Sequence, residues 1–320
     1  MIRGSDECLG APTRMDTAAA APFGPESASG RNALLAAGIV STMIGAVIGG
    51  HANNPGPPGP RLLHSRRPIP ILMYHAIAPA PAGAEWPQLF VKPIRFRAQM
   101  EYLAGEGYTA VTLDQVYGAW EKDGLVPPKA IVISFDDGYR GDYTDALPTL
   151  ADHDWPGVLN LKLGALEDGE LTERMIEEML SASWELDSHT ISHPDLTTMQ
   201  GASLTEEVAG SRQMLQDEFG VPVNFFCYPA GRFNPRVVRE VREAGYLGAT
   251  TTQPGLASCE NLYKLRRIRM EQRDSVRSLA AKLGAPPDEL LLLQGAEDEL
   301  SLKGFNERGT DLPGTSPDRP

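Results

Sequence analysis

Two short segments of this chain carry side chains that can do chemistry together. Asp136 and Asp137 end the apolar run 130–135, and His189 and His193 follow a second strand-like run four residues apart. Burying two adjacent carboxylates is costly unless a cation lies beside them. One carboxylate and two imidazoles can hold a divalent metal and leave a position open for water. The second carboxylate is then free to act as a base, so the pattern predicts metal-assisted hydrolysis.

Two further strand-like runs also end in polar side chains. His75 ends the run 71–75, and Tyr228 stands near the end of the run 224–229. In barrels of alternating strands and helices, the active site gathers at the C-terminal ends of the strands. An Asp-Asp-Gly sequence alone is often only a turn. Several strand ends with such groups are therefore a more specific signal than any one of them.

The region between residues 69 and 285 alternates apolar runs with amphipathic segments. Strands are expected near 71–75, 130–135, 157–162, 184–188, 224–229, 247–252 and 265–270. Apolar strands alternating with helices favour a parallel sheet that helices cover. We expect an α/β fold, a (β/α) barrel with about seven strands. An open doubly wound sheet is the alternative, which periodicity alone does not exclude.

Capping signals locate several helix starts within this region. Thr112 with Gln115 forms a capping box before a short helix, and Ser203 with Glu206 predicts a second one. Asn234 before a proline is typical of a helix N-cap. No glycine-rich phosphate loop follows the first strand, so the sequence gives nucleotide binding no support.

Charge and cysteine content narrow the classes of partner. The 320 residues carry a formal net charge of −13, which argues against nucleic acid and favours a neutral or cationic substrate. The cysteines are Cys8, Cys227 and Cys259, without a CxxC spacing. Cys227 is expected to be a buried, inert thiol, and a bridge between Cys227 and Cys259 stays open.

The chain ends differ in composition from the central region. Residues 33–50 carry no charged side chain, and Gly50 and Ala52 are small residues suited to a cleavage site. A signal peptide or an uncleaved anchor would place the protein at the cell surface or outside the cell, with membrane contact only through 33–50. The expected segments are a polar leader (1–32), the signal or anchor (33–52), a Pro/Gly-rich linker (53–68), a catalytic domain (69–285) and an acidic, largely disordered tail (286–320).

Three motifs in this region resemble those of the polysaccharide deacetylases, the NodB-homology domains of carbohydrate esterase family four. They are Ser-Phe-Asp-Asp-Gly-Tyr (134–139), Ser-His-Thr-Ile-Ser-His-Pro (188–194) and Phe-Cys-Tyr-Pro-Ala-Gly-Arg-Phe-Asn (226–234). The segment Ile-Leu-Met-Tyr-His (71–75) looks like the opening strand of the branch with exported poly-N-acetylglucosamine deacetylases. The resemblance spans roughly residues 70–270 and implies a distorted seven-stranded NodB-like barrel.

The resemblance also implies roles for individual residues. Asp137, His189 and His193 would hold one divalent metal, which in this family is usually Zn²⁺, with Co²⁺ or Ni²⁺ as substitutes. Asp136 would be the general base, and Tyr228 would donate its backbone N–H to the oxyanion. Amide hydrolysis needs an activated water, a polarised carbonyl and a protonated leaving amine, and these groups supply the first two.

Two family motifs have no clear match in this chain. The fourth, an aspartate near a tryptophan, has no counterpart after residue 234, and the fifth reads Leu-Arg-Arg where the family has Leu-x-His. Arginine keeps its proton and is a poor general acid. His75, or Asp136 after it has taken the proton from water, is therefore the candidate acid. Arg232 and Arg267 are expected to bind substrate or orient other groups.

These observations favour an exported metal-dependent deacetylase that removes N-acetyl groups from N-acetylglucosamine units of a cell-surface glycan. The missing fifth-motif histidine supports an alternative, a glycan-binding barrel with impaired catalysis. A metal-dependent hydrolase of a small non-sugar amide is a third hypothesis. The sequence does not distinguish between glycans, and it does not give the oligomeric state.

Overall fold

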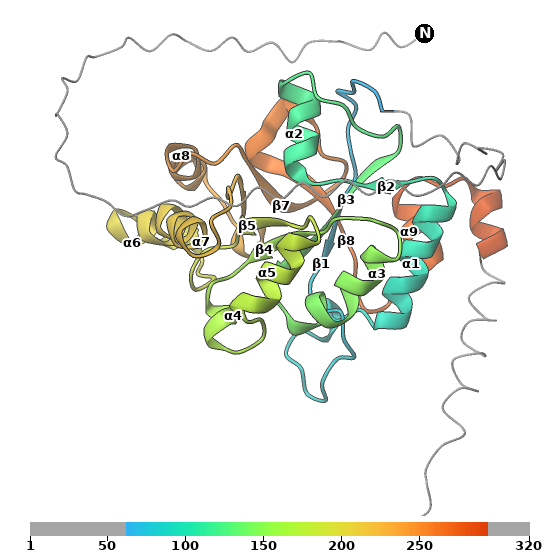
Figure 1. Cartoon of the computed structure of the whole chain (residues 1–320), viewed down its shortest axis with the longest axis horizontal. Coiled ribbons are helices and arrows are strands. Elements are labelled where there is room, and N and C mark those ends of the chain that lie inside the picture. Colours follow the sequence, from blue (N-terminus) through green and yellow to red (C-terminus); the bar gives the residue numbers. More distant parts are fainter. Residues whose placement is uncertain (1–61, 294–320) are drawn as a thin grey trace, which may run out of the picture. The chain divides into compact units, whose positions relative to one another are not determined.

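A closed ring of parallel strands forms the centre of the molecule (Figure 1). The computed structural model describes residues 62–293. The ring closes because β1 pairs with both β8 and β3, so the predicted seven-stranded barrel is confirmed and the open sheet is excluded. A short strand that the sequence did not predict, β2, pairs only with β3. The strands are β1 (Ile71–Tyr74), β2 (Thr109–Ala110), β3 (Ala130–Asp137), β4 (Val158–Leu161), β5 (Glu185–Ser188), β6 (Phe225–Cys227), β7 (Gly248–Pro254) and β8 (Leu265–Arg269).

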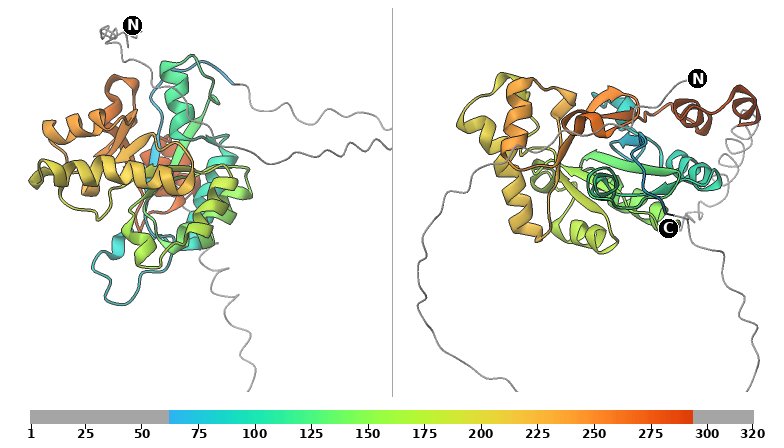
Figure 2. Two further views of the ribbon diagram at one scale, coloured as in Figure 1. Left: turned by 60° about the vertical axis from the view of Figure 1, so that its left-hand side comes forward. Right: turned by 90° about the horizontal axis from the view of Figure 1, so that it is seen from above.

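Helices cover this ring (Figure 2). They are α1 (Pro93–Gly105), α2 (Leu113–Glu121), α3 (Leu147–Ala151), α4 (Gly164–Glu167), α5 (Glu173–Ser181), α6 (Ala202–Thr205), α7 (Ser211–Phe219), α8 (Pro235–Glu243) and α9 (Val276–Lys282). Two predicted caps are confirmed. Thr112 and Gln115 form a complete capping box at α2. The Asn234 side chain accepts hydrogen bonds from the first backbone N–H groups of α8.

The predicted capping box at Ser203 and Glu206 is wrong. Helix α6 starts after Gly201, whose φ of 60° any other residue type rarely adopts. Ser203 therefore lies inside the first turn, and its hydroxyl donates to the Gln200 carbonyl at 3.1 Å. A π-helical turn, Glu206–Gly210, then joins α6 to α7.

Alternate residues along the strands pack into two separate hydrophobic clusters. Ile71, Val132 and Val158 pack with residues of α2, including the buried Trp120. Their chain neighbours, such as Ile133, pack against the helices outside the ring. Successive side chains of a strand point to opposite faces, so the first cluster fills the inside of the barrel near the start of the strands. Toward the strand ends, the inward positions become polar.

Several predicted segments lie outside the described residues, namely 1–32, 33–52, most of 53–68 and the tail beyond 293. Residues just before the barrel are attached to it, since Leu63 and Val126 form an antiparallel bridge. Past the predicted domain end, residues 287–293 are helical, and Tyr102 donates to Glu289 at 2.6 Å. Between residues 62 and 293, the structure has no helix long and apolar enough to cross a membrane.

Candidate functional site

The two adjacent carboxylates at the end of β3 have different surroundings. Asp136 points into the barrel and is 2% exposed. Asp137 has a φ of 76°, which turns its side chain toward the loops at the mouth of the barrel. Gly138 continues this turn with a φ of 85°, and a Cβ there would lie 2.6 Å from the Leu161 side chain. The turn therefore needs glycine, and it separates one inner carboxylate from one outer carboxylate.

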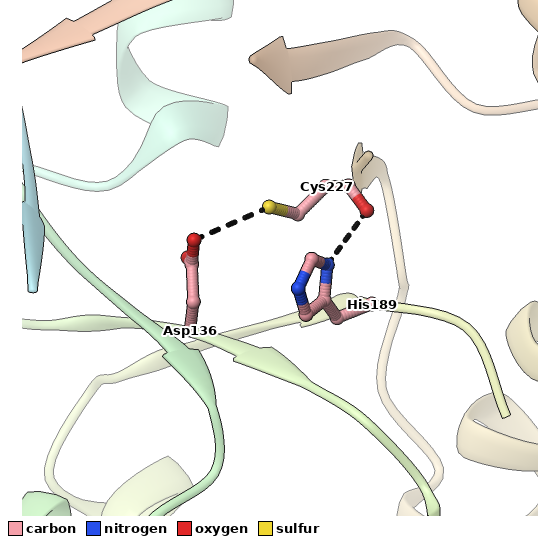
Figure 3. A group of neighbouring side chains, drawn as sticks. All are labelled: Asp136, His189 and Cys227. Carbon is pink, nitrogen blue, oxygen red and sulfur yellow. Dashed lines mark hydrogen bonds between the residues drawn. The ribbon is translucent and has the colours of Figure 1, made fainter. Parts of the chain in front are cut away.

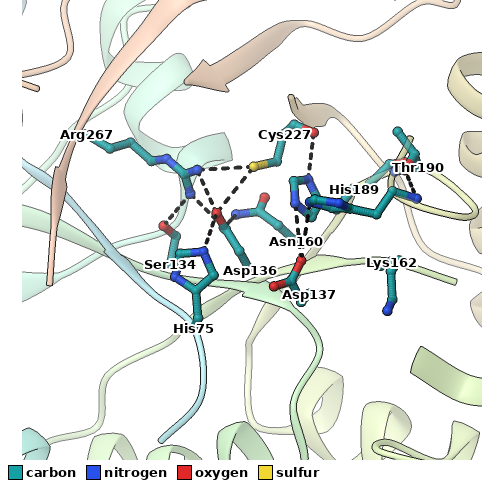
Figure 4. A network of polar contacts seen from close by, with 12 residues as sticks. His75, Ser134, Asp136, Asp137, Asn160, Lys162, His189, Thr190, Cys227 and Arg267 are labelled. Carbon is teal, nitrogen blue, oxygen red and sulfur yellow. Dashed lines mark hydrogen bonds and ion pairs between the residues drawn. The ribbon is translucent and has the colours of Figure 1, made fainter. Parts of the chain in front are cut away.

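Arg267 of β8 binds Asp136 through both terminal nitrogens of its guanidinium group. Nη1–Oδ1 and Nη2–Oδ2 are each 2.7 Å, and Asn160 of β4 donates to Oδ1 at 2.8 Å (Figure 4). Burial alone would raise the pKa of Asp136, but the charge and hydrogen bonds of Arg267 outweigh it and hold that pKa well below its usual value. Asp136 is therefore ionised, and Arg267 orients it, as one of the two roles predicted for this arginine.

Cys227 lies beside the same carboxylate as a free, buried thiol, so it forms no bridge with Cys259. Its Sγ is 3.6 Å from Asp136 Oδ2 and 3.2 Å from Arg267 Nη2. Together with His189, this thiol and Asp136 have donor atoms close enough to form a metal-binding group (Figure 3). The guanidinium already occupies both oxygens of Asp136, so we exclude a second cation at this inner group.

His189 is held at the end of β5 by the sheet. Its Nδ1 is 2.7 Å from the Cys227 carbonyl, and because a carbonyl only accepts, Nδ1 carries the hydrogen (Figure 3). The other nitrogen, Nε2, lies 3.5 Å from Asp137 Oδ1. The bond to the carbonyl thus fixes the ring orientation and leaves Nε2 available as a metal ligand.

His193 reaches the same carboxylate from a loop. Its Nε2 lies 3.7 Å from Asp137 Oδ1, and its side chain is 35% exposed. Its backbone N–H donates to the Thr190 hydroxyl at 2.9 Å. Glu207 also contacts this loop, where its carboxylate accepts from the N–H groups of Ile191 and Ser192 at 2.9 and 3.1 Å.

The outer group of Asp137, His189 and His193 fits a divalent metal. Its three donor atoms lie within 4.8 Å of one another. A tetrahedral zinc site with metal–ligand distances of about 2.0–2.1 Å has donor atoms roughly 3.3–3.4 Å apart. The observed separations of 3.5 and 3.7 Å from the Asp137 oxygen are close to that spacing. One carboxylate and two imidazoles are also a donor set typical of catalytic zinc.

His75 lies at the end of β1, on the opposite side of Asp136 from Asn160 (Figure 4). Its Nε2 is 3.9 Å from Asp136 Oδ2, and its buried Nδ1 has no hydrogen-bond partner among the described residues. Burial lowers the pKa of His75 to about 4, although the nearby carboxylates oppose this shift. The ring is therefore neutral at pH 7.

Two further predicted site residues, Tyr228 and Arg232, bond to protein groups around the site. The Tyr228 backbone N–H donates to the Thr250 carbonyl at 3.2 Å as part of the β6–β7 pairing, which contradicts the predicted oxyanion contact. Arg232 is exposed and donates to Asp195 at 2.8 Å. It joins the loop after β6 to the loop after His193, so of its two predicted roles the structure has the orienting one.

Three residues of the site were missed in the sequence: Asn160, Thr190 and Glu207. Asn160 had a usable signal, because it is a lone amide within the apolar run 157–161. Thr190 lies between the two histidines and had no separate signal. Glu207 stands beside a similar acid, Glu206, in a segment whose periodicity predicts an ordinary helix.

Comparisons of the sequence and of the structure with known proteins find relatives of one family. Residues 123–249 match the family model described as "Polysaccharide deacetylase". The Bacillus subtilis (strain 168) protein YxkH, whose name assigns it to the polysaccharide deacetylases, is 30% identical over 204 residues, which are 63% of this chain and 71% of that protein.

A solved structure, that of the Streptococcus pyogenes deacetylase PplD in complex with acetate, aligns with a TM-score of 0.63 and 30% identity. The alignment covers 68% of this chain and 99% of that one. The Escherichia coli (strain K12) poly-beta-1,6-N-acetyl-D-glucosamine N-deacetylase is 24% identical over 238 residues, which are 60% of this chain but only 35% of that protein.

Proposed function

The chain belongs to the polysaccharide deacetylase family, and we propose that it is a metal-dependent enzyme that removes N-acetyl groups from N-acetylglucosamine units of a cell-surface glycan. One observation carries the proposal. Asp137, His189 and His193 gather around a common point, and an ionised second carboxylate lies directly beside them. A barrel that only binds glycans would have little need for both a ligand carboxylate and a base.

We infer that Asp137, His189 and His193 hold one divalent metal, and Zn²⁺ suits this donor set. When bound, such an ion lowers the pKa of water and stabilises negative charge on the acetyl oxygen. His189 keeps its metal-binding nitrogen free because Nδ1 is committed to the Cys227 carbonyl.

Asp136 is the proposed general base. Arg267 keeps it ionised and its two oxygens fixed, so it is ready to accept a proton from water. The same guanidinium makes protonated Asp136 a strong acid, so the carboxyl gives the proton up readily. The lowered pKa also makes Asp136 a weak base, so proton transfer to it would depend on a bound metal that acidifies the water.

His75 is the proposed route for the returning proton. It is neutral before the reaction, and its Nε2 lies 3.9 Å from the Asp136 oxygen that also faces Arg267. Asp136 can pass the proton to this nitrogen, which then donates it to the amine. This assignment compensates for the missing fifth-motif histidine without using Arg267, which does not release a proton.

One relative and one sequence segment support the proposed glycan and location. A relative named for deacetylation of poly-beta-1,6-N-acetyl-D-glucosamine matches the chain, and this name suggests the substrate class. The uncharged run 33–50 suggests export, which would bring the enzyme to a cell-surface polymer. We therefore propose an N-acetylated glycan outside the cytoplasm as the substrate.

The deciding experiment measures bound metal and acetate release on β-1,6- and β-1,4-linked N-acetylglucosamine oligomers. Wild type is compared with Asp136→Asn and Asp137→Ala, and the matched control is Asp152→Asn on the outer surface, where the carboxylate pairs with Arg97 at 3.5 Å. We expect Asp137→Ala to lose the metal. Asp136→Asn should keep the metal and lose at least about 10²–10⁴-fold in kcat.

Each contrary result has a distinct meaning. Bound metal with no acetate release from any oligomer would favour the glycan-binding barrel. Release from simple amides but not from oligomers would favour the small-amide hydrolase. Equal activity of Asp136→Asn and wild type would remove Asp136 from the mechanism.

A further inference from the structure

We propose that Glu207 is a positioning residue for His193: its carboxylate holds the backbone of the loop 190–193 in the conformation that turns His193 toward Asp137. The inference rests on the proposed metal site. It adds a residue that makes no contact with the metal ligands' side chains and acts only through the loop backbone.

Glu207 makes three hydrogen bonds to two consecutive loop residues. One oxygen, Oε2, accepts from the backbone N–H of Ile191 at 2.9 Å and of Ser192 at 3.1 Å. The other oxygen, Oε1, accepts from the Ser192 hydroxyl at 2.5 Å. The residue is only 9% exposed, so water competes little for these bonds.

The loop needs this support because its backbone is strained. Thr190 and His193 have φ values of 72° and 60°, in the left-handed region that residues with a Cβ rarely adopt. A residue in this region is strained and persists only where its surroundings enforce it. Hydrogen bonds to a carboxylate are stronger than those between neutral groups, so the three bonds of Glu207 oppose this strain.

Other contacts of the loop hold different atoms. Leu163 and Gly164 donate their N–H groups to the carbonyls of Thr190 and Ile191 at 3.2 and 3.0 Å. These bonds fix the carbonyl side of the loop near its start. The N–H groups of Ile191 and Ser192 point to Glu207, and they would lose this acceptor if its carboxylate were removed.

The backbone that carries Glu207 explains how it reaches the loop. Glu207 lies in the π-helical turn Glu206–Gly210, between α6 and α7. Its neighbour Glu206 is exposed, whereas Glu207 and Val208 are buried. Wide turns of this type often occur at functional sites, and here the turn brings a carboxylate against the loop.

The test measures Zn²⁺ and Co²⁺ dissociation constants and the visible spectrum of the Co²⁺-loaded protein, so it does not depend on activity. We expect Glu207→Ala to weaken metal binding about 10–100-fold and to change the Co²⁺ spectrum, because His193 is no longer fixed as a ligand. Glu206→Ala is the matched control and should behave as wild type.

Two conservative variants distinguish positioning from general stability. Glu207→Gln can keep all three contacts, because its carbonyl oxygen accepts both N–H groups and its amide donates to the Ser192 hydroxyl. It should bind metal within about threefold of wild type. Glu207→Asp keeps the charge but is one methylene too short, so it should bind metal nearly as poorly as Glu207→Ala.

Wild-type affinity and an unchanged Co²⁺ spectrum in Glu207→Ala would overturn the inference. If Glu207→Ala does not fold, equal affinities of Glu207→Gln and Glu207→Asp would overturn it instead. A wild-type protein that binds metal but releases no acetate would contradict the proposed function and leave the role of Glu207 intact. A wild-type protein that binds neither ion would overturn both.

Discussion

His189 and His193 contribute to one site but are held in place by different means. His189 follows a strand, its side chain is 3% exposed, and its ring bonds a carbonyl of the next strand. His193 lies in a strained loop, its side chain is 35% exposed, and its position depends on contacts of the loop backbone. The first ligand is fixed by the barrel itself, whereas the second is fixed by side chains that bind a loop.

Fold stability and metal affinity should therefore depend on different parts of the site. The strand-held part contains Asp136, Arg267 and Asn160, which make up a buried polar layer inside the barrel. Substitutions there should lower both the stability of the fold and the activity. The loop-held part contains Thr190, His193 and Glu207, and damage there should cost metal affinity while the barrel stays folded.

The largest expected effect comes from Arg267→Leu in the strand-held part. The variant leaves the Asp136 carboxylate buried without its cation, which typically costs about 3–5 kcal/mol of the free energy of unfolding. Urea denaturation of wild type and variant measures this loss. The control is the double variant with Asp136→Leu, which removes the stranded charge and should recover much of the stability.

A double variant as unstable as Arg267→Leu alone would mean that packing of the arginine stem, not its charge, holds this layer together. The strand-held part would then depend on packing rather than on electrostatics.

The second-largest expected effect is a pH dependence of the unfolding free energy, which comes from a buried acid inside the barrel. Asp187 of β5 is fully buried and accepts from the Phe225 N–H at 2.9 Å, but its Oδ2 has no partner among the described residues. Burial raises the pKa of Asp187 to about 7, the opposite of the shift at Asp136. Burial also raises the pKa of the neighbouring Glu185 well above its usual value, so Asp187 and Glu185 titrate as a pair. Asp136 differs from this pair because the charge of Arg267 neutralises it.

The raised pKa gives a definite sign for the stability. Below about pH 4 Asp187 is protonated in both the folded and unfolded states, and it costs nothing. Between about pH 4 and 7 only the unfolded state releases the proton, so stability falls as the pH rises, by at most about 1.4 kcal/mol per pH unit. Above pH 7 the loss is complete.

Asp187→Asn should reduce this slope, and the coupled acid Glu185 should keep part of it. The gain in unfolding free energy of the variant over wild type should grow from near zero at pH 4 to at most about 4 kcal/mol at pH 7.5. Urea titrations at several pH values measure it, with Asp152→Asn as the exposed control. A gain that does not change with pH would show that Asp187 ionises normally.

The sequence predicted the barrel, and it singled out Asp136, Asp137, His189 and His193, which the structure brings together, because those signals are local. Alternating runs give the strands, and residue types at the strand ends give the chemistry. It left two roles open for Arg267, because the Asp136 partner lies 131 residues away. It misassigned the Tyr228 N–H, because that role depends on whether the β6–β7 pairing extends one residue further.

Glu207 was beyond sequence reasoning for a different reason. Helical periodicity predicts which face of a segment is buried, but a π-helical turn shifts that face by a residue, and no residue type in 206–210 marks it. The supports of the loop-held half, Thr190 and Glu207, therefore had to be found in the structure, whereas His193 and most of the strand-held half were visible in the sequence.

The smallest expected effect concerns the Thr190 hydroxyl in the loop 190–193. Thr190→Val keeps the shape of the side chain but removes the hydroxyl that accepts from the His193 N–H at 2.9 Å. We expect a three- to tenfold weaker Zn²⁺ affinity, about 0.7–1.4 kcal/mol, because one neutral hydrogen bond is lost. The unfolding free energy of the metal-free protein should change less, since that bond orders a loop at the barrel mouth. Thr190→Ser keeps the hydroxyl and should bind Zn²⁺ as wild type does. If Thr190→Val instead destabilised the metal-free barrel as much as Arg267→Leu does, the loop would be part of the cooperative core, and the distinction between the two histidines would not hold.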